Sequence, residues 1–373
     1  MMLRNCFQSV FSSLREILKE PLFDGTPPRS VVGLDGYVDN LYTVIREIRE
    51  DGTHVPYATS DELIHRMMQA QGQSMEREIV CKSCQPGGNA PLMAMGLASL
   101  GIPTHCIGFF GGEYQSTEFD ILRERCEVTD LGPPAKCIAL EFSDCKFMFS
   151  ENKPFDELNA DELFRRCGED HLHHLFSQSQ LISFLNWAGI RHMTQILDAI
   201  KHRILDRMDL TGKIMFFDFS DISSRSSREF NAYTHLISSL ACLCTVVVSL
   251  NVNEARQAAV NLGVSVLDEE YLLPSLRQAL CVHELVIHGM GFSMVGTDLG
   301  YWHMNTPLLE HPMVTTGGGD HFNSGYCAAK LADLSPLHTM ALANATALYY
   351  VSSGTQGTLS EIACFLQPYC TSD

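Results

Sequence analysis

Long apolar runs and a basic surface are both missing from this chain of 373 residues. No run approaches the roughly 18 uninterrupted apolar residues that a membrane-spanning helix needs, so we expect no membrane partner. The formal net charge of −18 leaves no basic stripe for a phosphate backbone, which argues against a general nucleic-acid binder. With 45% hydrophobic residues, the chain has ample material for the core of one large domain.

Several sequence signatures are absent too. The Gly-x-x-x-x-Gly-Lys-Ser/Thr loop and the Gly-x-Gly-x-x-Gly fingerprint do not occur, so the motifs indicate neither a P-loop enzyme nor a dinucleotide binder. Cys81 and Cys84 form a Cys-x-x-Cys pair with no second pair at zinc spacing, which disfavours a structural zinc site. Most of the 14 cysteines lie inside apolar runs, so we expect buried free thiols in a cytoplasmic protein.

The chain does contain three consecutive glycines, at positions 317–319, followed by Asp320 and a stretch that we expect to be helical. Three glycines in a row cost conformational entropy, so they indicate a place where backbone N–H groups approach a ligand closely. A helix N-terminus with free amides is an anion site. A carboxylate there can take a proton from a hydroxyl during phosphoryl transfer. The alternative is a glycine-rich turn whose aspartate caps the helix.

Apolar runs alternate with helical patterns along most of the chain. We expect buried strands at 30–34, 105–110, 181–185, 213–219, 245–250 and 284–289. Such alternation demands a mainly parallel sheet with helices on both faces. Polar residues follow several of the runs, and the carboxyl ends of parallel strands meet at one edge of the sheet. We therefore expect the functional site at that edge.

Three segments differ from this pattern. Residues 137–149 alternate around a Ser-Asp turn, which predicts an antiparallel hairpin that covers the site as a lid. Residues 40–80 are polar, and we expect them to be mostly helical. Residues 1–20 have apolar positions at helical spacing, which predicts an amphipathic helix packed on the body rather than a signal peptide.

Four stretches, in chain order, are similar to the motifs of the PfkB-type carbohydrate kinases, the family with the ribokinase-like fold. Residues 315–325 resemble its second signature: two threonines (Thr315 and Thr316), a glycine-rich anion hole, a catalytic aspartate and a helix of small residues. Gly33 and Asp39 resemble the first strand and its substrate-binding aspartate. Their spacing is more similar to that of the ADP-dependent sugar kinases, which share the fold.

The other two motifs lie between these ends. Gly87 and Gly88, followed by a helix of small and apolar residues, resemble the first signature of the family. Asn251-x-x-Glu254 resembles the Asn-x-x-Glu motif that organises magnesium and phosphate. The resemblance extends over residues 29–370.

The resemblance implies an α/β protein with a three-layer αβα ribokinase-like fold, a mainly parallel central sheet and a small β lid. Residues 29–373 then form the kinase domain, with part of the lid at 137–150, and residues 1–28 form an N-terminal helical extension. The implied activity is phosphoryl transfer from a nucleotide, ATP in preference to ADP, to a hydroxyl of a carbohydrate. The implied cofactor is Mg²⁺, held through water by Glu254, because Mg²⁺ keeps several of its waters.

The resemblance also assigns roles to single residues. Asp320 is implied as the base, with the transferring phosphoryl charge held by the amides of Gly317, Gly318 and Gly319. The implied substrate-binding residues are Asp35, Asp39, Gly88, Asn89 and Asn186. The implied nucleotide-binding residues are Thr315, Thr316, Asn251, Glu254, His288, Gly289 and Asn344.

Two alternatives remain open at the level of the sequence. A nucleoside kinase on the same fold would use Asp39 to bind ribose hydroxyls. A non-catalytic nucleotide- or sugar-binding regulator is the other alternative, because Val314 stands where the family has an acidic or polar residue and Leu92 where it has an asparagine. The exposed edges of the hairpin also allow a homodimer through the lid.

Overall fold

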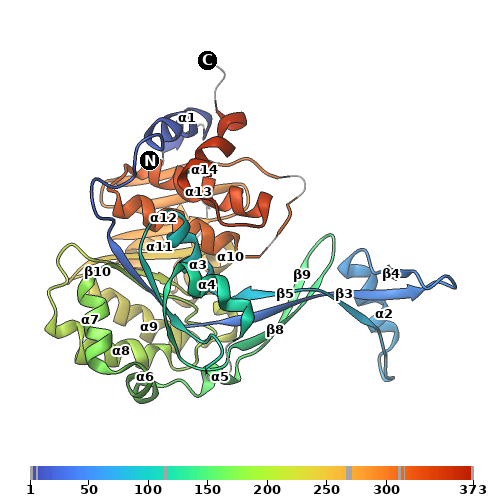
Figure 1. Cartoon of the computed structure of the whole chain (residues 1–373). Coiled ribbons are helices and arrows are strands. Elements are labelled where there is room, and N and C mark those ends of the chain that lie inside the picture. Colours follow the sequence, from blue (N-terminus) through green and yellow to red (C-terminus); the bar gives the residue numbers. More distant parts are fainter. Residues whose placement is uncertain are drawn as a thin grey trace.

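The computed structural model describes residues 3–5, 7–112, 116–265, 271–309, 312–314 and 316–370. Within these residues, a sheet of ten strands forms the body of the molecule, in the order β1-β15-β14-β13-β12-β11-β10-β2-β6-β7 (Figure 1). The strand bounds are β1 (Leu3–Asn5), β2 (Arg29–Gly33), β6 (Thr104–Gly108), β7 (Glu127–Asp130), β10 (Ser179–Phe184), β11 (Ile214–Asp218), β12 (Thr245–Asn251), β13 (Glu284–His288), β14 (Phe292–Thr297) and β15 (Gly300–Asn305). Neighbouring strands run parallel, except that β14 is antiparallel to β13 and to β15.

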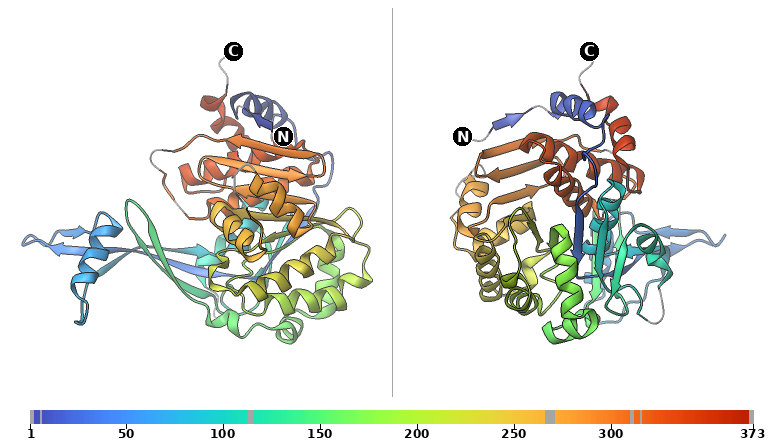
Figure 2. Two further views of the ribbon diagram at one scale, coloured as in Figure 1. Left: turned by 180° about the vertical axis from the view of Figure 1, so that it is seen from behind. Right: turned by 60° about the vertical axis from the view of Figure 1, so that its left-hand side comes forward.

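Helices cover both faces of this sheet. The α-helices among the described residues are α1 (Phe7–Ile17), α2 (Ser60–Gln69), α3 (Asn89–Ser99), α4 (Asp120–Arg125), α5 (Lys153–Asp156), α6 (Ala160–Cys167), α7 (Glu169–Gln178), α8 (Met193–Arg203), α9 (Ser227–Leu240), α10 (Val252–Asn261), α11 (Leu272–Leu280), α12 (Gly318–Leu331), α13 (Pro336–Ser353) and α14 (Leu359–Phe365). Helices α5 to α11 pack in one hydrophobic core, and α1, α3, α4, α12, α13 and α14 pack in another. Figure 2 shows the two helical layers with the sheet between them.

Neighbouring residues on one strand belong to opposite cores. Val31 and Phe217 pack on the side of α5 to α11, whereas Val32 and Phe216 pack on the other side. Because both faces of the sheet are covered, each central strand is an almost continuous apolar run, which is the signal visible in the sequence. The predicted three-layer αβα fold with a mainly parallel sheet is confirmed.

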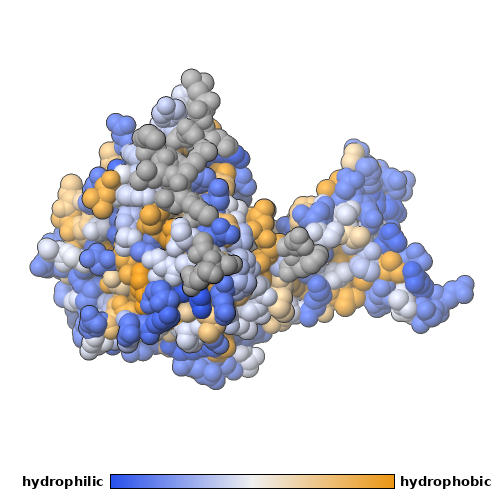
Figure 3. All heavy atoms as spheres, turned by 90° about the horizontal axis from the view of Figure 1, so that it is seen from above, coloured by the Kyte–Doolittle hydropathy of each residue, from blue (hydrophilic) through white to orange (hydrophobic). Residues whose placement is uncertain are grey.

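A smaller curled sheet forms the lid, which projects from the body as an arm (Figures 2 and 3). Its strands are β3 (Tyr37–Ile48), β4 (His54–Pro56), β5 (Ile79–Gly87), β8 (Ala135–Glu141) and β9 (Lys146–Glu151). β3 runs parallel to β8 and antiparallel to β5, and β8 and β9 form the predicted hairpin. The prediction of a β hairpin in a lid is confirmed.

The prediction that residues 40–80 are mostly helical is wrong. Most of β3, all of β4 and the start of β5 lie in this segment, and α2 is its single described helix. The pairing of β3 with β5 and β8 connects residues far apart in the chain, so no local pattern reveals it. Such pairing overrides local propensity, which is a weak guide for half-exposed strands.

The segment before residue 29 packs on the body. β1 pairs in parallel with β15 at one edge of the large sheet, and α1 buries Phe11 and Leu14 in the core beside α13. Arg15 Nε donates a hydrogen bond of 2.9 Å to the carbonyl of Ala363, which ties α1 to α14. None of the described helices is long and apolar enough to cross a bilayer.

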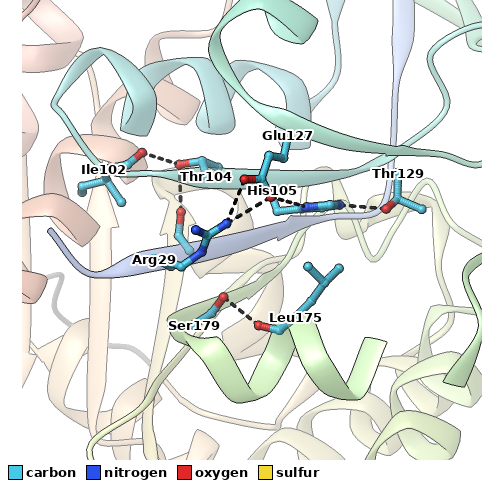
Figure 4. Close-up of polar contacts among 9 residues, drawn as sticks. Arg29, Ile102, Thr104, His105, Glu127, Thr129, Leu175 and Ser179 are labelled. Atoms are coloured by element: carbon cyan, nitrogen blue, oxygen red, sulfur yellow. Dashed lines mark hydrogen bonds and ion pairs between the residues drawn. The ribbon is translucent and has the colours of Figure 1, made fainter. Parts of the chain in front are cut away.

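Polar contacts join the strands at the other edge of the large sheet (Figure 4). Arg29 Nη2 donates to both carboxylate oxygens of Glu127 at 3.0 Å, which connects the start of β2 to the start of β7. His105 Nε2 lies 2.7 Å from Thr129 Oγ1, between β6 and β7. The ion pair is half-exposed and contributes about 0–1 kcal/mol, so this edge depends mainly on its backbone ladder.

Helices α12 and α13 pack closely against each other, and a glycine makes this close packing possible. A Cβ added at Gly325 would lie 2.6 Å from Thr346 Oγ1 and 2.8 Å from both Ala343 Cα and Leu342 O. Real Cβ atoms do not approach that closely, and two of the three neighbours are backbone atoms that cannot rotate away. Gly325 therefore sets the distance between the two helices and the position of the N-terminus of α12.

Gly325→Ala tests this packing. Alanine gains up to about 1 kcal/mol over glycine in an open helix, but overpacking costs about 1–3 kcal/mol, so we expect a net loss of about 1–2 kcal/mol. Urea unfolding followed by circular dichroism measures the loss. Gln195→Ala, at an exposed position of α8, is the matched control and stays near wild type. Equal stability of Gly325→Ala and wild type would mean that the helices are not held at this distance.

Candidate active site

The carboxyl ends of adjacent parallel strands bring polar side chains to one edge of the sheet, as expected for open α/β sheets. In the order of the sheet, His288, Asn251 and Asp218 are the last residues of β13, β12 and β11, and Asn186 and Asp35 follow β10 and β2 by two residues. The N-termini of α3 and α12 reach the same edge, with Asn89 and Asp320 in their first turns. Sequence motifs far apart in the chain therefore meet in one place.

The glycines at the start of α12 leave room for close neighbours. Gly317 has φ +82°, the left-handed conformation that favours glycine, and caps the helix. A Cβ at Gly317 would lie 3.1 Å from Leu92 and from Tyr350, one at Gly318 would lie 3.1 Å from Val351, and one at Gly319 would lie 3.2 Å from His288. The first amides of α12 thus face a narrow space, at the positive end of a helix of 14 residues.

Asp320 lies in that first turn and is partly buried. Its surroundings raise the pKa of its carboxyl well above the usual range, first because of burial and then because of the nearby carboxylates of Asp218 and Asp35. Asn89 opposes this shift, because its Nδ2 donates a hydrogen bond of 2.9 Å to Asp320 Oδ1. Burial and the neighbouring acids therefore raise the affinity of the Asp320 carboxylate for a proton. The first backbone amides of α12 lie beside it.

Asp35 caps the other helix N-terminus at the site. Its fully buried carboxylate accepts hydrogen bonds from the amides of Asn89 and Ala90, at 3.0 and 2.8 Å. Asn186 Nδ2 adds a third hydrogen bond of 2.7 Å. Burial still raises the pKa of Asp35, although all three hydrogen bonds lower it. Gly88, with φ +98°, precedes these amides and lets the chain turn onto the carboxylate.

Asp39 comes from the lid rather than from the sheet edge. It stands in β3 opposite the end of β5, where a Cβ at Gly87 would collide with its carboxyl group. Burial raises the pKa of Asp39 to about 6, the ammonium group of Lys146 opposes the shift, and Asp35 adds to it. The lid therefore brings its own carboxylate toward the sheet edge, together with a cation from β9.

Asn251 and Glu254 form a capping box at the start of α10. The amide and Nδ2 of Asn251 donate to the two oxygens of Glu254 at 2.8 and 2.6 Å, and Asn251 Oδ1 accepts from the amides of Asn253 and Glu254. Burial raises the pKa of Glu254 to about 8, and the charges of Asp218 and Asp221 raise it further. Asn251 and Glu254 line a cavity of about 490 Å³ together with Asp221 and Arg256.

These acids fit a divalent cation that keeps its waters. Among the described residues, no three His, Cys, Asp or Glu side chains converge closely enough to hold a metal directly. Mg²⁺ prefers oxygen ligands and usually binds through one or two carboxylates plus water and phosphate. The carboxylate of Glu254, near Asp218 and Asp221, offers that kind of charge without a dedicated cage.

A second cavity of about 490 Å³ opens on the other side of Asn251, beside the N-terminus of α12. Its lining includes polar groups from Asn251, His288, Asn344 and the backbone of Gly289 and of the glycines at 317–319. The lining also includes the apolar side chains of Met290, Leu308, Leu309, Ala347, Leu348 and Val351. A cavity that combines apolar side chains with the backbone amides of a helix N-terminus fits a planar base joined to phosphates.

Of the predicted nucleotide-binding residues, Asn251, His288, Gly289 and Asn344 line this cavity, while Glu254 lines the neighbouring one. Thr316 is described but is not in the lining of either cavity, and Thr315 lies outside the described residues. The Nδ2 of Asn344 is hydrogen-bonded at 2.8 Å to Ser293 Oγ and to Met340 O.

The match to known proteins covers nearly the whole chain. The family model of the prokaryotic ketohexokinases matches residues 9–369. The chain belongs to the prokaryotic ketohexokinase family. A ketohexokinase of Haloferax volcanii is 25% identical over 96% of this chain and 95% of its own length.

Solved structures agree with the fold of this ketohexokinase-family chain. Thermotoga maritima ribokinase matches with a TM-score of 0.61 and 16% identity, over 91% of this chain and 99% of that one. Arabidopsis thaliana ribokinase, solved with ribose and ATP, matches with a TM-score of 0.60 and 15% identity, over 93% and 100%. The predicted resemblance to PfkB-type carbohydrate kinases is confirmed, and the chain is a carbohydrate kinase, a phosphotransferase with an alcohol acceptor.

The sequence-based reading of this kinase missed some residues at the site. Ser220 follows Asp218 in a left-handed turn (φ +56°) and donates a hydrogen bond of 3.0 Å to Asn89 Oδ1. His321 is fully buried, stacks on Tyr350 with ring centroids 3.5 Å apart, and has its Nδ1 2.7 Å from Gly317 O. The position of Ser220 after a strand that ends in an acid was its one signal in the sequence. For His321, only its adjacency to Asp320 pointed to the site.

The raised pKa of Glu254 predicts a pH dependence of stability. An acid whose pKa is higher in the folded chain holds its proton more tightly there, so its contribution is complete below the ordinary value of 4.5 and is lost as the pH rises through about 8. Glu254→Gln removes this titration, although it also weakens the capping box. We expect the melting temperature to fall less in the variant than in wild type between about pH 5 and about pH 8.

Thermal melts without divalent cations measure this difference, and repeating them with Mg²⁺ at the higher pH adds a second comparison. We expect Mg²⁺ to stabilise wild type more than Glu254→Gln, because the ionised carboxylate attracts the cation. Parallel pH curves for the two proteins would contradict the assigned titration.

Proposed function

We propose that this chain transfers the terminal phosphoryl group of ATP to a hydroxyl of a ketohexose, with Mg²⁺. The observation that carries the proposal is the position of Asp320, in the first turn of α12 between the glycine amides and the Asn89 side chain. Membership in the ketohexokinase family supports the sugar class. The apolar cavity beside the glycines supports a nucleotide donor, and the ATP in the Arabidopsis ribokinase supports ATP as that donor.

In this mechanism, Asp320 accepts the proton of the attacking hydroxyl as that oxygen bonds to the terminal phosphorus and ADP departs. The raised pKa of Asp320 suits this role, since a carboxylate with a raised pKa accepts a proton more readily. The amides of Gly317, Gly318 and Gly319 hold the charge that the phosphoryl oxygens carry. Mg²⁺, when bound near Asn251 and Glu254, offsets the charge of the donor phosphates.

We infer two kinds of substrate contact. Asp39 and Asn89 bind sugar hydroxyls directly, one from the lid and the other from the N-terminus of α3. Asp35 and Asn186 act behind them, because the carboxylate of Asp35 already accepts hydrogen bonds from α3 and from Asn186. Gly88 gives the chain the conformation in which Asn89 faces the site.

The decisive experiment combines a substrate panel with Asp320→Asn. We expect ATP-dependent phosphorylation of a ketohexose at a higher kcat/KM than of aldohexoses, ribose or nucleosides. Asp320→Asn keeps the shape of the side chain but cannot take the proton, so kcat falls by about 10²–10⁴-fold. A coupled assay for ADP formation measures both effects.

The control for Asp320→Asn is its thermal stabilisation by Mg²⁺ and ATP, which stays close to that of wild type. Near-normal turnover of the variant would contradict the assignment of Asp320 as the base. A preference for nucleosides would favour the nucleoside kinase alternative over the sugar kinase. Turnover with ADP but not with ATP would identify ADP as the phosphoryl donor. Nucleotide binding without phosphorylation of any alcohol on the panel would favour the regulator.

We also propose that two chains associate through their lids. Strand β9 is an edge of the lid sheet, and its side chains Met148 and Phe149 are 49% and 58% exposed. Ile138, paired with Phe149 on the same face, is 43% exposed. Figure 3 shows apolar side chains among the polar ones on this arm. An exposed edge with apolar side chains is a template for pairing with another chain.

Light scattering tests this association with Phe149→Asp. We expect wild type at twice the chain mass of 41.5 kDa and the variant at the single mass, because a buried charge opposes the contact. Leu299→Asp, at an 82% exposed turn of the body, is the matched control and keeps the mass of wild type. A wild-type protein that is monomeric at micromolar concentration would end the proposal.

A further inference from the structure

Asn89 has two ends that are chemically different, and the site needs one of them in a fixed place. Its Nδ2 donates to Asp320 Oδ1 at 2.9 Å, and its Oδ1 accepts from Ser220 Oγ at 3.0 Å. A carboxamide rotated by a half turn would direct an oxygen toward the Asp320 carboxylate, where two acceptors repel each other. The hydroxyl of Ser220 therefore contacts the end of Asn89 that the base does not use.

A series of hydrogen bonds that involves β11, α12 and β12 holds Ser220 in place. It stands after β11 in a left-handed conformation, with φ +56°, and its amide donates a hydrogen bond of 2.9 Å to Asp218 Oδ1. Asp218 Oδ2 accepts from Asn323 Nδ2 of α12 at 2.8 Å, and Asn323 Oδ1 accepts from Ser249 Oγ of β12 at 2.7 Å. This series of hydrogen bonds extends from Ser249 in the sheet to the carboxylate of Asp320.

We propose that Ser220 is a positioning residue for phosphoryl transfer: its hydroxyl fixes the Asn89 carboxamide so that the Nδ2 group stays on the Asp320 carboxylate. This inference rests on the proposed function, in which Asp320 is the base. Ser220 makes no proton transfer of its own. Its effect on the reaction passes through the orientation of Asn89.

The role has a signature in the pH profile. The hydrogen bond from Asn89 lowers the pKa of Asp320 against the opposing effects of burial, Asp218 and Asp35. When the carboxamide is no longer held, part of this stabilisation of the ionised base is lost. The acid limb of the kcat–pH profile then moves to higher pH, and turnover recovers as the pH is raised.

Ser220→Ala tests the inference. We expect kcat to fall about 2- to 12-fold at neutral pH, the effect of one hydrogen bond, with the KM for ATP unchanged. Ser220→Gly tolerates the left-handed conformation better and still lacks the hydroxyl, so it should show the same shift of the acid limb. Ser224→Ala, at an exposed position four residues on, is the matched control and keeps the wild-type profile.

A double-mutant cycle with Asn89→Ala gives the sharper comparison. If Ser220 acts through Asn89, Ser220→Ala causes no further loss of kcat in the Asn89→Ala background. Additive losses, or an acid limb that does not move in Ser220→Ala, would overturn the inference. These outcomes are separate from a failure of the proposed function, which appears as a wild-type chain without phosphoryl transfer or as an Asp320→Asn variant with normal turnover.

Discussion

Four buried or partly buried carboxylates meet at the carboxyl edge of the sheet, and each accepts a hydrogen bond from one asparagine side chain. Asn186 donates to Asp35, Asn323 to Asp218, Asn89 to Asp320, and Asn251 to Glu254. A carboxylate in a water-poor interior must be hydrogen-bonded, and a neutral amide meets that need without cancelling the charge. The pKa values of these acids therefore stay raised, whereas lysine or arginine partners would have lowered them.

Because the partners of these acids are neutral asparagines, they lower the pKa values of the acids less than charged partners would. An arginine or lysine beside Asp320 would lower its pKa and weaken it as a base, whereas Asn89 opposes the upward shift only in part. The same logic applies to Glu254, whose pKa of about 8 reflects burial and the neighbouring Asp218 and Asp221. Asp39 is the exception, since the cation of Lys146 acts on it. The carboxylate that comes from the lid thus differs electrostatically from those that belong to the body.

The sequence predicted the parts of this arrangement whose causes are local. The strands were visible because both faces of each one are buried, and the glycines at 317–319 because only close neighbours explain three in a row. The pairing of Asp320 and Asp218 with their asparagines was not visible, because Asn89 and Asp320 are 231 residues apart and Asn323 and Asp218 are 105 apart. The lid strand β3 was misread for the same reason, since its partners β5 and β8 are distant in the chain.

The way the lid is attached explains why the amide contacts matter beyond electrostatics. β3 begins two residues after Asp35, and β5 ends at Gly87, two residues before Asn89, so these two of the five strands of the arm enter the body at the site itself. Movement of the lid would pull on those residues unless something held them. Asp35 does so by accepting from the amides of Asn89 and Ala90, and Ser220 and Asp320 hold the Asn89 side chain. Asp39 lies farther along β3, beyond these contacts, so the arm carries this carboxylate while the hydrogen bonds at the body hold the base and its partners.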